Sequence, residues 1–224
     1  MSAAPPGRVA DSELAERIAA AAIELALPLG PEQVSRLVTY LRLIERWNAT
    51  YNLTSIRDSS SMATQHIVDS LAAAAALRRR RTPRDRRHLV DVGSGAGLPG
   101  VVFAVALPET EVVCVDSVGK KAAFITHAAG SVGASNVISV HARVERLKDR
   151  RFDVIASRAF ASLPDFVAGT RHLLADNGEW LAMKGKAPAS EIAGLAGVEA
   201  EIEALEVPSL AADRCIVWMH SMHE

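Results

Sequence analysis

The feature that most constrains this chain is a glycine-rich loop placed directly after a short apolar run. The run His88–Val92 leads into Gly93-Ser94-Gly95-Ala96-Gly97, and residues from about 99 to 106 have the composition of a helix. Glycine suits such a junction because the chain must turn tightly and bring its backbone close to a ligand. The order strand, glycine loop, helix predicts an α/β fold that holds a nucleoside-containing ligand at the loop.

From residue 88 onward, short apolar runs alternate with helical segments. Strands are expected at His88–Val92, Glu111–Val115, Val137–Val140, Phe152–Ala156, Glu179–Met183, Ile202–Val207 and Cys215–His220. Helices are expected near residues 99–106, 119–131 and 163–174. Such alternation is typical of a parallel, doubly wound sheet, and the last two runs are expected to form a hairpin. The predicted fold is a Rossmann-like α/β fold, with a mostly parallel seven-stranded sheet and helices on both faces.

Residues 1–87 have a different pattern. The first ten residues are rich in Pro, Gly and Ala and are expected to form a disordered tail. Apolar residues at helical spacing then predict helices at about 11–27, 31–47 and 60–77. The expected organisation is a tail over 1–10, a helical extension with a basic linker over 11–87, and a ligand-binding core over 88–224.

Positive charge is concentrated in one short segment of a chain whose net charge is −1. Residues 78–88 hold seven arginines and one aspartate, whereas residues 1–77 hold six basic and eight acidic side chains. Residues 89–224 hold twelve basic and seventeen acidic side chains. The segment 78–88 is either a solvated linker or a phosphate-binding patch, and both interpretations stay open.

The cysteines and the hydropathy pattern indicate the compartment. Cys114 and Cys215 lie in apolar runs and match no zinc-ligand spacing, so we expect two reduced core residues and no metal site. No stretch approaches about eighteen consecutive apolar residues, and residues 1–9 lack the order of a signal peptide. We therefore expect a cytoplasmic protein with no membrane contact. The absence of coiled-coil heptads favours a monomer.

Residues around the loop narrow the choice of ligand. Asp116 ends the next expected strand, where a carboxylate can accept hydrogen bonds from both hydroxyls of a ribose. The dinucleotide pattern G-x-G-x-x-G requires glycine at position 98, where this chain has Leu98, and no Gly-Lys-Ser/Thr of a Walker loop follows. Asp91, two residues before the loop, suits a ligand that carries a positive charge. We therefore expect S-adenosylmethionine as the cofactor, with Gly93, Gly95, Leu98 and Asp116 among the residues that bind it.

The fourth expected strand ends without the residues that activate a poor methyl acceptor. Amino-group methyltransferases of nucleic acids commonly have Asn/Asp-Pro-Pro-aromatic there, whereas this chain has Arg158-Ala159-Phe160, and neither cysteine is placed as a nucleophile. Arg143, Arg158 and Lys184 instead follow three strands, at the edge where parallel sheets bind ligands. Guanine N7 suits such a site because its free lone pair needs no deprotonation and basic side chains can bind the O6/N7 edge.

Other functions stay open on these residues alone. One is an S-adenosylmethionine-dependent methyltransferase that acts on another RNA, a protein or a small molecule. A nicotinamide oxidoreductase is disfavoured by Leu98. A module that binds the cofactor or RNA without turnover is a further alternative. Binding of RNA that falls steeply with salt would separate an RNA substrate from a small molecule.

Six runs of the chain resemble one known family. They are Tyr51–Asp58, His66–Leu71, Asp91–Gly100, Asp116–Lys121, Ser157–Leu163 and Met183–Lys186. The Leu98-Pro99-Gly100 and Ser157-Arg-Ala-Phe160 runs are specific to this family rather than to methyltransferases at large. Over about residues 30–220 the chain resembles the bacterial 16S rRNA (guanine-N7) methyltransferase G family, also called glucose-inhibited division protein B.

The resemblance implies methylation of N7 of one guanine, nucleotide 527 in the 530 loop of 16S rRNA. It implies 16S rRNA, the 30S subunit or an assembly intermediate of that subunit as the partner. It further implies cofactor contacts at Gly93, Leu98, Val144, Glu145 and Arg158. Arg143 and Lys184 match basic residues of an RNA-facing cleft, which implies that they position the substrate and that no general base is needed.

Five residues near the N-terminal helices carry weaker signals. His66 and Asp69 lie one helical turn apart, and a capping or inter-domain hydrogen bond is their expected role. Trp47 and Tyr51 are expected to cover the core rather than to stack on an extruded base. Gln65 departs from the family pattern, because a basic residue is frequent there, and this weakens any RNA contact by these helices.

Overall fold

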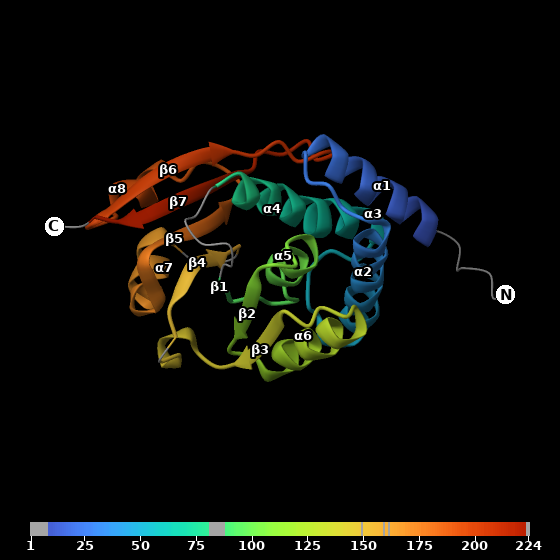
Figure 1. The fold of residues 1–224 in the computed structure, drawn as a ribbon, viewed down its shortest axis with the longest axis horizontal. Coiled ribbons are helices and arrows are strands. Elements are labelled where there is room, and N and C mark those ends of the chain that lie inside the picture. Colours follow the sequence, from blue (N-terminus) through green and yellow to red (C-terminus); the bar gives the residue numbers. More distant parts are fainter. Residues whose placement is uncertain (1–8, 81–87, 149, 159, 161, 223–224) are drawn as a thin grey trace.

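The computed structural model describes residues 9–80, 88–148, 150–158, 160 and 162–222. Within them, seven strands form a sheet in the order β3-β2-β1-β4-β5-β7-β6 (Figure 1). The strands are β1 (His88–Val92), β2 (Glu111–Asp116), β3 (Val137–His141), β4 (Phe152–Ser157), β5 (Leu174–Lys184), β6 (Val198–Ala204) and β7 (Cys215–Ser221). β1 to β5 pair in parallel, and β7 runs antiparallel to both β5 and β6. The predicted mostly parallel sheet and its terminal hairpin are confirmed.

The predicted start of β5 was wrong. The strand begins at Leu174 rather than at Glu179. Its first part contains Asn177 in the left-handed region (φ 64°), and the pairing of β4 with β5 shifts register between Phe152 and Val154. An irregularity of this kind places polar residues inside a strand and interrupts the apolar run that predicts it.

The predicted bounds of β6 were also wrong, since the strand spans Val198–Ala204 and not Ile202–Val207. β6 is the edge strand, and its pairing with β7 fixes Ala204 opposite Cys215. Acidic and apolar residues alternate along β6. Such alternation is typical of a strand that has one face partly in solvent. The apolar residues Leu205 and Val207 are buried beyond the strand's end, which explains why the apolar pattern pointed past it.

The N-terminal part folds into α1 (Asp11–Glu24), α2 (Pro31–Tyr51), α3 (Ser59–Met62) and α4 (Asp69–Arg79), with the π-helical turn η1 (Ala63–Val68) between α3 and α4. α2 begins at Pro31 as predicted, because proline suits the first helical position. It continues past the predicted end at Trp47 and stops before Asn52, which has a left-handed backbone (φ 48°). The predicted third helix is present, but its π turn follows no sequence pattern and was not predicted.

The C-terminal part contains α5 (Gly100–Ala106), α6 (Gly119–Ser131), α7 (Leu163–Thr170) and α8 (Ala189–Ala193), with the 3-10 turns η2 (Val144–Arg146) and η3 (Arg171–Leu173). α7 is shorter than the helix predicted over 163–174, because η3 and the early start of β5 follow it. α8 buries no residue and therefore has no apolar periodicity from which to predict it.

Alternate strand residues point into two apolar clusters, one on each face of the sheet. In β1, Leu89 packs with residues of α1, α2, α4, α5 and α6, whereas Val90 packs with residues of α7. Figure 1 shows α4, α5 and α6 on one side of the sheet and α7 and α8 on the other. The prediction of helices on both faces is confirmed.

α4 joins the N-terminal helices to the sheet. Every residue from Asp69 to Leu77 is buried, including five consecutive alanines at 72–76. A helix buried on all sides has no amphipathic stripe, and its small side chains let neighbouring elements approach closely. α1, α2 and α4 therefore contribute to the same apolar cluster as α5 and one face of the sheet.

Two arginines at the end of α4 pair with acids on the sheet. Arg79 Nη2 donates to Glu203 Oε1 at 2.7 Å. Arg80 Nε donates to Oε2 of the buried Glu179 at 2.9 Å, and its Nη2 donates to Glu201 Oε2 at 3.0 Å. These arginines belong to the segment interpreted as a linker or a phosphate patch, and their charges are already matched within the protein.

Residues 81–87 of the basic segment and residues 1–8 of the predicted disordered tail lie outside the described residues, so the structure tests neither prediction there. In the part of the chain that the structure describes, no helix is both long and apolar enough to cross a membrane.

Candidate cofactor and substrate site

The glycine loop leaves open space on one of its sides. Gly93 and Gly95 both have a left-handed backbone, with φ of 68° and 59°. A Cβ atom at Gly93 would meet nothing within 4 Å, and one at Gly95 would meet only the Gly93 carbonyl oxygen, at 3.9 Å. The backbone there is accessible to a ligand, which is the property expected of a nucleoside-binding loop.

Asp116 is fixed beside this open side. Its Oδ2 accepts a hydrogen bond from the Gly95 amide at 2.9 Å, and its Oδ1 accepts one from the Val118 amide at 2.8 Å. The carboxylate is buried at the end of β2, and each oxygen has a further lone pair. It can therefore accept both ribose hydroxyls of a nucleoside held on the loop.

Asp91 lies inside the protein behind the loop. Its Oδ2 accepts a hydrogen bond from the Gly100 amide at 2.9 Å, whereas its buried Oδ1 has no hydrogen-bond partner among the described residues. A Cβ at position 100 would lie 2.5 Å from Cys114 Sγ and 2.8 Å from Asp91 Oδ2, so only glycine permits this approach. Burial raises the pKa of Asp91 to about 7, against the hydrogen bond from Gly100 that lowers it.

A tyrosine from α2 holds the loop from the opposite side. The Tyr40 hydroxyl donates to the carbonyl oxygens of Ala96 and Gly97, the second at 3.0 Å. Gly97 has a φ of 82°, and a Cβ there would lie 3.1 Å from the Tyr40 hydroxyl. Tyr40 is fully buried, and burial raises the pKa of its hydroxyl well above the ordinary value, so it acts as a neutral donor. The sequence analysis missed this residue because it lies in the apolar stripe of α2.

The connection from β3 to β4 forms the wall opposite Gly93. Within the described residues it contains the short turn η2 and no α-helix. This short connection lies close to the glycine loop. Arg143, Val144 and Glu145 line one pocket together with Gly93 and Phe160. The structure thus brings together four of the residues predicted to contact cofactor or substrate. Leu98 is buried beneath the loop, where its amide donates to Ser94 O at 3.0 Å.

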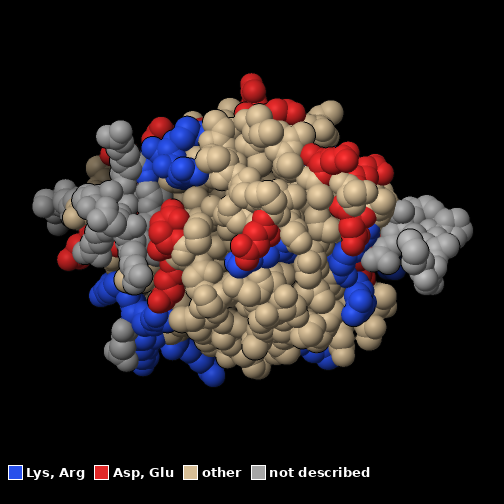
Figure 2. All heavy atoms as spheres, turned by 45° about the vertical axis from the view of Figure 1, so that its right-hand side comes forward, with Lys and Arg blue, Asp and Glu red and all other residues tan. Residues whose placement is uncertain are grey.

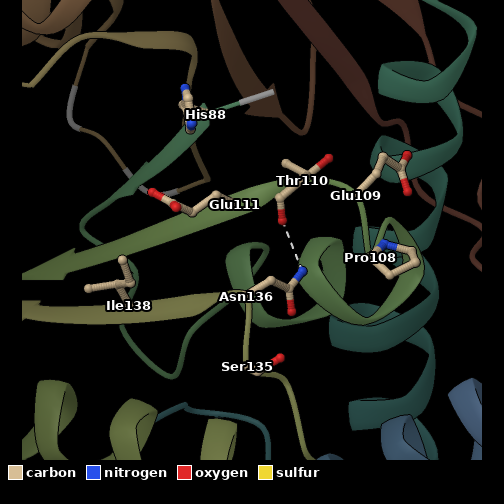
Figure 3. A pocket seen from close by; sticks show the side chains of 8 residues that line it. All are labelled: His88, Pro108, Glu109, Thr110, Glu111, Ser135, Asn136 and Ile138. Atoms are coloured by element: carbon tan, nitrogen blue, oxygen red, sulfur yellow. Dashed lines mark hydrogen bonds between the residues drawn. The ribbon is translucent and has the colours of Figure 1, made fainter. Parts of the chain in front are cut away.

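A second pocket lies at the other end of the parallel strands, where β1 and β2 begin (Figure 3). It includes His88 and Glu111, the first residues of β1 and β2, and Asn136, whose side-chain amide donates to Thr110 O at 2.9 Å. Parallel sheets bind ligands at the carboxyl ends of their strands. The glycine loop follows the carboxyl end of β1, so this second pocket is not the cofactor site.

Arg158 connects the end of β4 to the π turn η1. Its Nη1 donates to Gln65 O at 3.3 Å and lies 3.3 Å from Nδ1 of the buried His66. Nδ1 of His66 also lies 3.1 Å from Gln65 O, and its Nε2 lies 2.8 Å from Thr54 Oγ1. Burial, followed by the Arg158 charge, lowers the pKa of His66 to about 4. His66 is therefore neutral at pH 7.

Asp69 completes this junction. Arg214 Nε donates to Asp69 Oδ1 at 2.9 Å, and Arg158 Nη1 lies 4.0 Å from Asp69 Oδ2. Burial raises the pKa of Asp69 against the two arginines, which lower it. His66 and Asp69 thus make hydrogen bonds and ion pairs between the N-terminal helices and the sheet, in agreement with their predicted inter-domain role.

Lys184 is bonded to an acidic residue, and the two cysteines are buried in the core. Lys184 Nζ bonds Oε2 of Glu191 at 3.0 Å, and the same carboxylate accepts the Leu163 amide at 2.7 Å, so this lysine already has an acidic partner. Cys114 and Cys215 are free and buried, as predicted, and burial raises the pKa of both thiols. Neither is poised as a thiolate nucleophile.

Comparison with known proteins identifies the family. The family model described as rRNA small subunit methyltransferase G matches residues 33–217. The chain is 49% identical over 220 residues to ribosomal RNA small subunit methyltransferase G of Acidovorax ebreus (strain TPSY), covering 94% of this chain and 97% of that protein. It is 52% identical over 204 residues to the protein of the same name from Acidovorax sp. (strain JS42), covering 87% and 90%. This chain belongs to the rRNA small subunit methyltransferase G family.

Solved methyltransferase structures share the fold of this chain. A crystal structure of an S-adenosylmethionine-dependent methyltransferase from Aquifex aeolicus matches with a TM-score of 0.53 at 14% identity, covering 71% of this chain and 92% of that chain. The likeness shows the fold, a Rossmann-like class I methyltransferase fold. The family resemblance drawn from the six sequence runs is confirmed, and this family member is an S-adenosylmethionine-dependent methyltransferase.

The loop fits that cofactor in two respects. The open space beside Gly93 and Gly95 accommodates an adenosine next to Asp116. The buried carboxyl group of Asp91 behind the loop, when ionised, favours a ligand that carries a positive charge.

We expect the carboxyl group of Asp91 to make cofactor binding depend on pH. With a folded-state pKa of about 7, Asp91 is mostly protonated at pH 5.5 and half ionised at pH 7. A cation binds the ionised form better, so the affinity for S-adenosylmethionine should rise about tenfold from pH 5.5 to pH 7. Calorimetric titrations at the two pH values measure this change.

The variant Asp91→Asn is the control, because its side-chain oxygen can still accept the Gly100 amide. It should bind the cofactor more weakly at pH 7 and with little pH dependence. A variant whose affinity rises with pH as steeply as that of the wild type would rule out Asp91 as the titrating group.

Proposed function

We propose that this enzyme transfers a methyl group from S-adenosylmethionine to N7 of one guanine of 16S rRNA, nucleotide 527 in the 530 loop. The observation that carries the proposal is the end of β4. Ser157 Oγ there donates to Val92 O at 3.0 Å, and the next residue is Arg158, which cannot act as a base. A site of this kind suits an acceptor atom that already has a free lone pair, as guanine N7 does.

The reaction then depends on positioning. The bound cofactor supplies an electrophilic methyl group on its sulfonium. Arg143, which lies in the pocket with Gly93, donates to O6 of the guanine or to an adjacent phosphate and leaves the N7 lone pair free. Holding N7 in line with the methyl group lowers the barrier without any proton transfer. Lys184, which bonds Glu191, lies at the end of β5 on the same edge of the sheet and positions the substrate together with Arg143.

The cofactor contacts follow from the same arrangement. The backbone at Gly93, Gly95 and Leu98 holds the nucleoside, and Asp116 binds its ribose. Val144 and Glu145, across the pocket from Gly93, hold the adenine edge with a backbone amide and a carboxylate. Arg158 contacts the cofactor from the β4 side, held by its bonds to Gln65 and His66.

Charge supports an RNA substrate at this edge. Lys120 and Arg143 follow the carboxyl ends of β2 and β3. Arg158, which follows β4, and Lys184, the last residue of β5, lie at the same edge with Asp69 and Glu191 as acidic neighbours. Figure 2 brings forward the side of the N-terminal helices, where acidic and basic groups are dispersed around a broad area of uncharged side chains. A phosphate backbone is better matched by the strand ends. The relatives reported above are named as ribosomal RNA methyltransferases.

We also propose a domain division, a cellular compartment and a partner for the enzyme. Residues 88–224 form the cofactor-binding core, and residues 11–87 form an extension that supports it. The enzyme acts in the cytoplasm as a monomer, with 16S rRNA or the 30S subunit or its assembly intermediate as the partner.

Mapping of the modified nucleotide tests the proposed acceptor. Mass spectrometry of 16S rRNA fragments should show one methyl group on the 530-loop guanine in wild-type cells and none in cells that lack the gene. Expression of this chain in the deletion strain should restore the methyl group. Equal methylation with and without the gene would refute the proposed substrate.

Arg143→Ala tests the positioning role. The variant loses a donor to the guanine or a phosphate but keeps the loop, so kcat/KM should fall about tenfold or more while cofactor affinity changes less than threefold. Arg146→Ala, an exposed residue of the same turn outside the pocket lining, is the matched control and should change neither. Equal losses of transfer and of cofactor affinity in Arg143→Ala would contradict the assigned role.

A further inference from the structure

An exposed aromatic side chain ends α2, the helix whose Tyr40 bonds the glycine loop. Tyr51 is the last residue of α2 and is 43% exposed. Of the large apolar side chains that are exposed in the described part of the chain, it is the only aromatic one. Its neighbour Trp47 lies 5.1 Å away, ring centre to ring centre, but also contacts Phe124 of α6 at 5.3 Å. Trp47 covers the core as predicted, whereas Tyr51 keeps much of its ring in solvent.

The ring rests on a rigid support. Asn48, one turn earlier in α2, donates from its side chain to Ile56 O at 3.0 Å and accepts the Thr54 amide at 2.8 Å. These bonds hold the chain that follows Tyr51 against the helix. An aromatic ring on such a support loses little conformational freedom when a flat ligand stacks on it.

A cation accompanies the ring, close to the cofactor residues. Lys120 Nζ lies 5.6 Å from the centre of the Tyr51 ring. Lys120 is exposed, has no ion pair among the described residues, and follows the ribose-binding Asp116 by four residues, which span at most about 14 Å. The ring therefore lies beside the first turn of α6, which follows the carboxyl end of β2, where Asp116 lies.

We propose that Tyr51 and Lys120 form a stacking platform for an unpaired nucleobase of the RNA substrate that neighbours the methylated guanine. The proposal rests on the proposed function. Stacking of a base on an aromatic ring is stronger than the attraction of an exposed lysine for that ring. An arriving base therefore displaces the ammonium, which then contacts the adjoining phosphate. The platform recognises single-stranded RNA without selecting its sequence.

Steady-state methyl transfer to 30S subunits from a deletion strain tests the platform. Tyr51→Ala should raise the KM for the subunit roughly five- to 150-fold, with kcat and the KM for S-adenosylmethionine nearly unchanged. Tyr51→Phe, which keeps the ring, should stay within twofold of the wild type. Tyr51→Leu, which keeps apolar bulk without an aromatic face, should behave like Tyr51→Ala.

Two further variants sharpen the test. Ile202→Ala removes a side chain of 44% exposure from β6 and is the matched control, expected to leave every constant unchanged. Lys120→Gln should reduce the slope of log affinity against log salt by about one, because one phosphate contact is lost. Melting temperatures of all variants separate a loss of folding from a loss of binding.

A second readout does not depend on methyl transfer. Fluorescence anisotropy of a labelled single-stranded oligoribonucleotide should show weaker binding to Tyr51→Ala than to Tyr51→Phe. An unchanged KM and unchanged anisotropy in a folded Tyr51→Ala variant would overturn the platform, as would equal losses in Tyr51→Ala and Tyr51→Phe. A wild-type enzyme that leaves the subunit unmethylated would overturn the proposed function instead, and the anisotropy series would still decide whether Tyr51 binds RNA.

Discussion

The hydroxyl of Tyr40 is the interaction on which the site depends most. It reaches from α2 to the carbonyl oxygens of Ala96 and Gly97, in the middle of a loop whose glycines have left-handed backbones. A loop of this kind loses much conformational entropy when it is fixed, and a buried hydrogen bond offsets part of that cost. The N-terminal helices therefore support the glycine loop, although they precede the first strand of the sheet.

The end of β4 is likewise held by residues of the N-terminal helices. Arg158 is held by His66 and Gln65 of the π turn and lies near Asp69, which also binds Arg214. A buried charge is stable only when it is paired and hydrogen-bonded, so these partners fix where the guanidinium can point. The neutral state of His66 matters here, because a protonated ring would place a second positive charge beside the Arg158 guanidinium. The proposed site is thus built by both parts of the chain.

Sequence patterns predicted the elements that have strong periodicity or strong turn residues. β1 and the start of α2 lie where they were expected, because an apolar run ends at Gly93 and Pro31 opens a helix. The edge strand β6 and the irregular start of β5 were misplaced, since their burial is set by neighbours distant in the chain. In the site, Gly93 and Asp116 could be predicted from their spacing. Tyr40 could not, because its position shows only an apolar stripe, although a buried tyrosine needs a hydrogen-bond partner.

The dependence of the cofactor loop on α2 is tested most directly by the affinity of Tyr40→Phe for S-adenosylmethionine. Thr170→Val is the matched control, because it removes a buried hydroxyl that accepts the Trp180 indole at 2.9 Å on the other face of the sheet. Both variants should lose stability. Only Tyr40→Phe should bind the cofactor roughly three- to tenfold more weakly, as expected for one lost hydrogen bond. An affinity of Tyr40→Phe equal to that of Thr170→Val and the wild type would contradict the account.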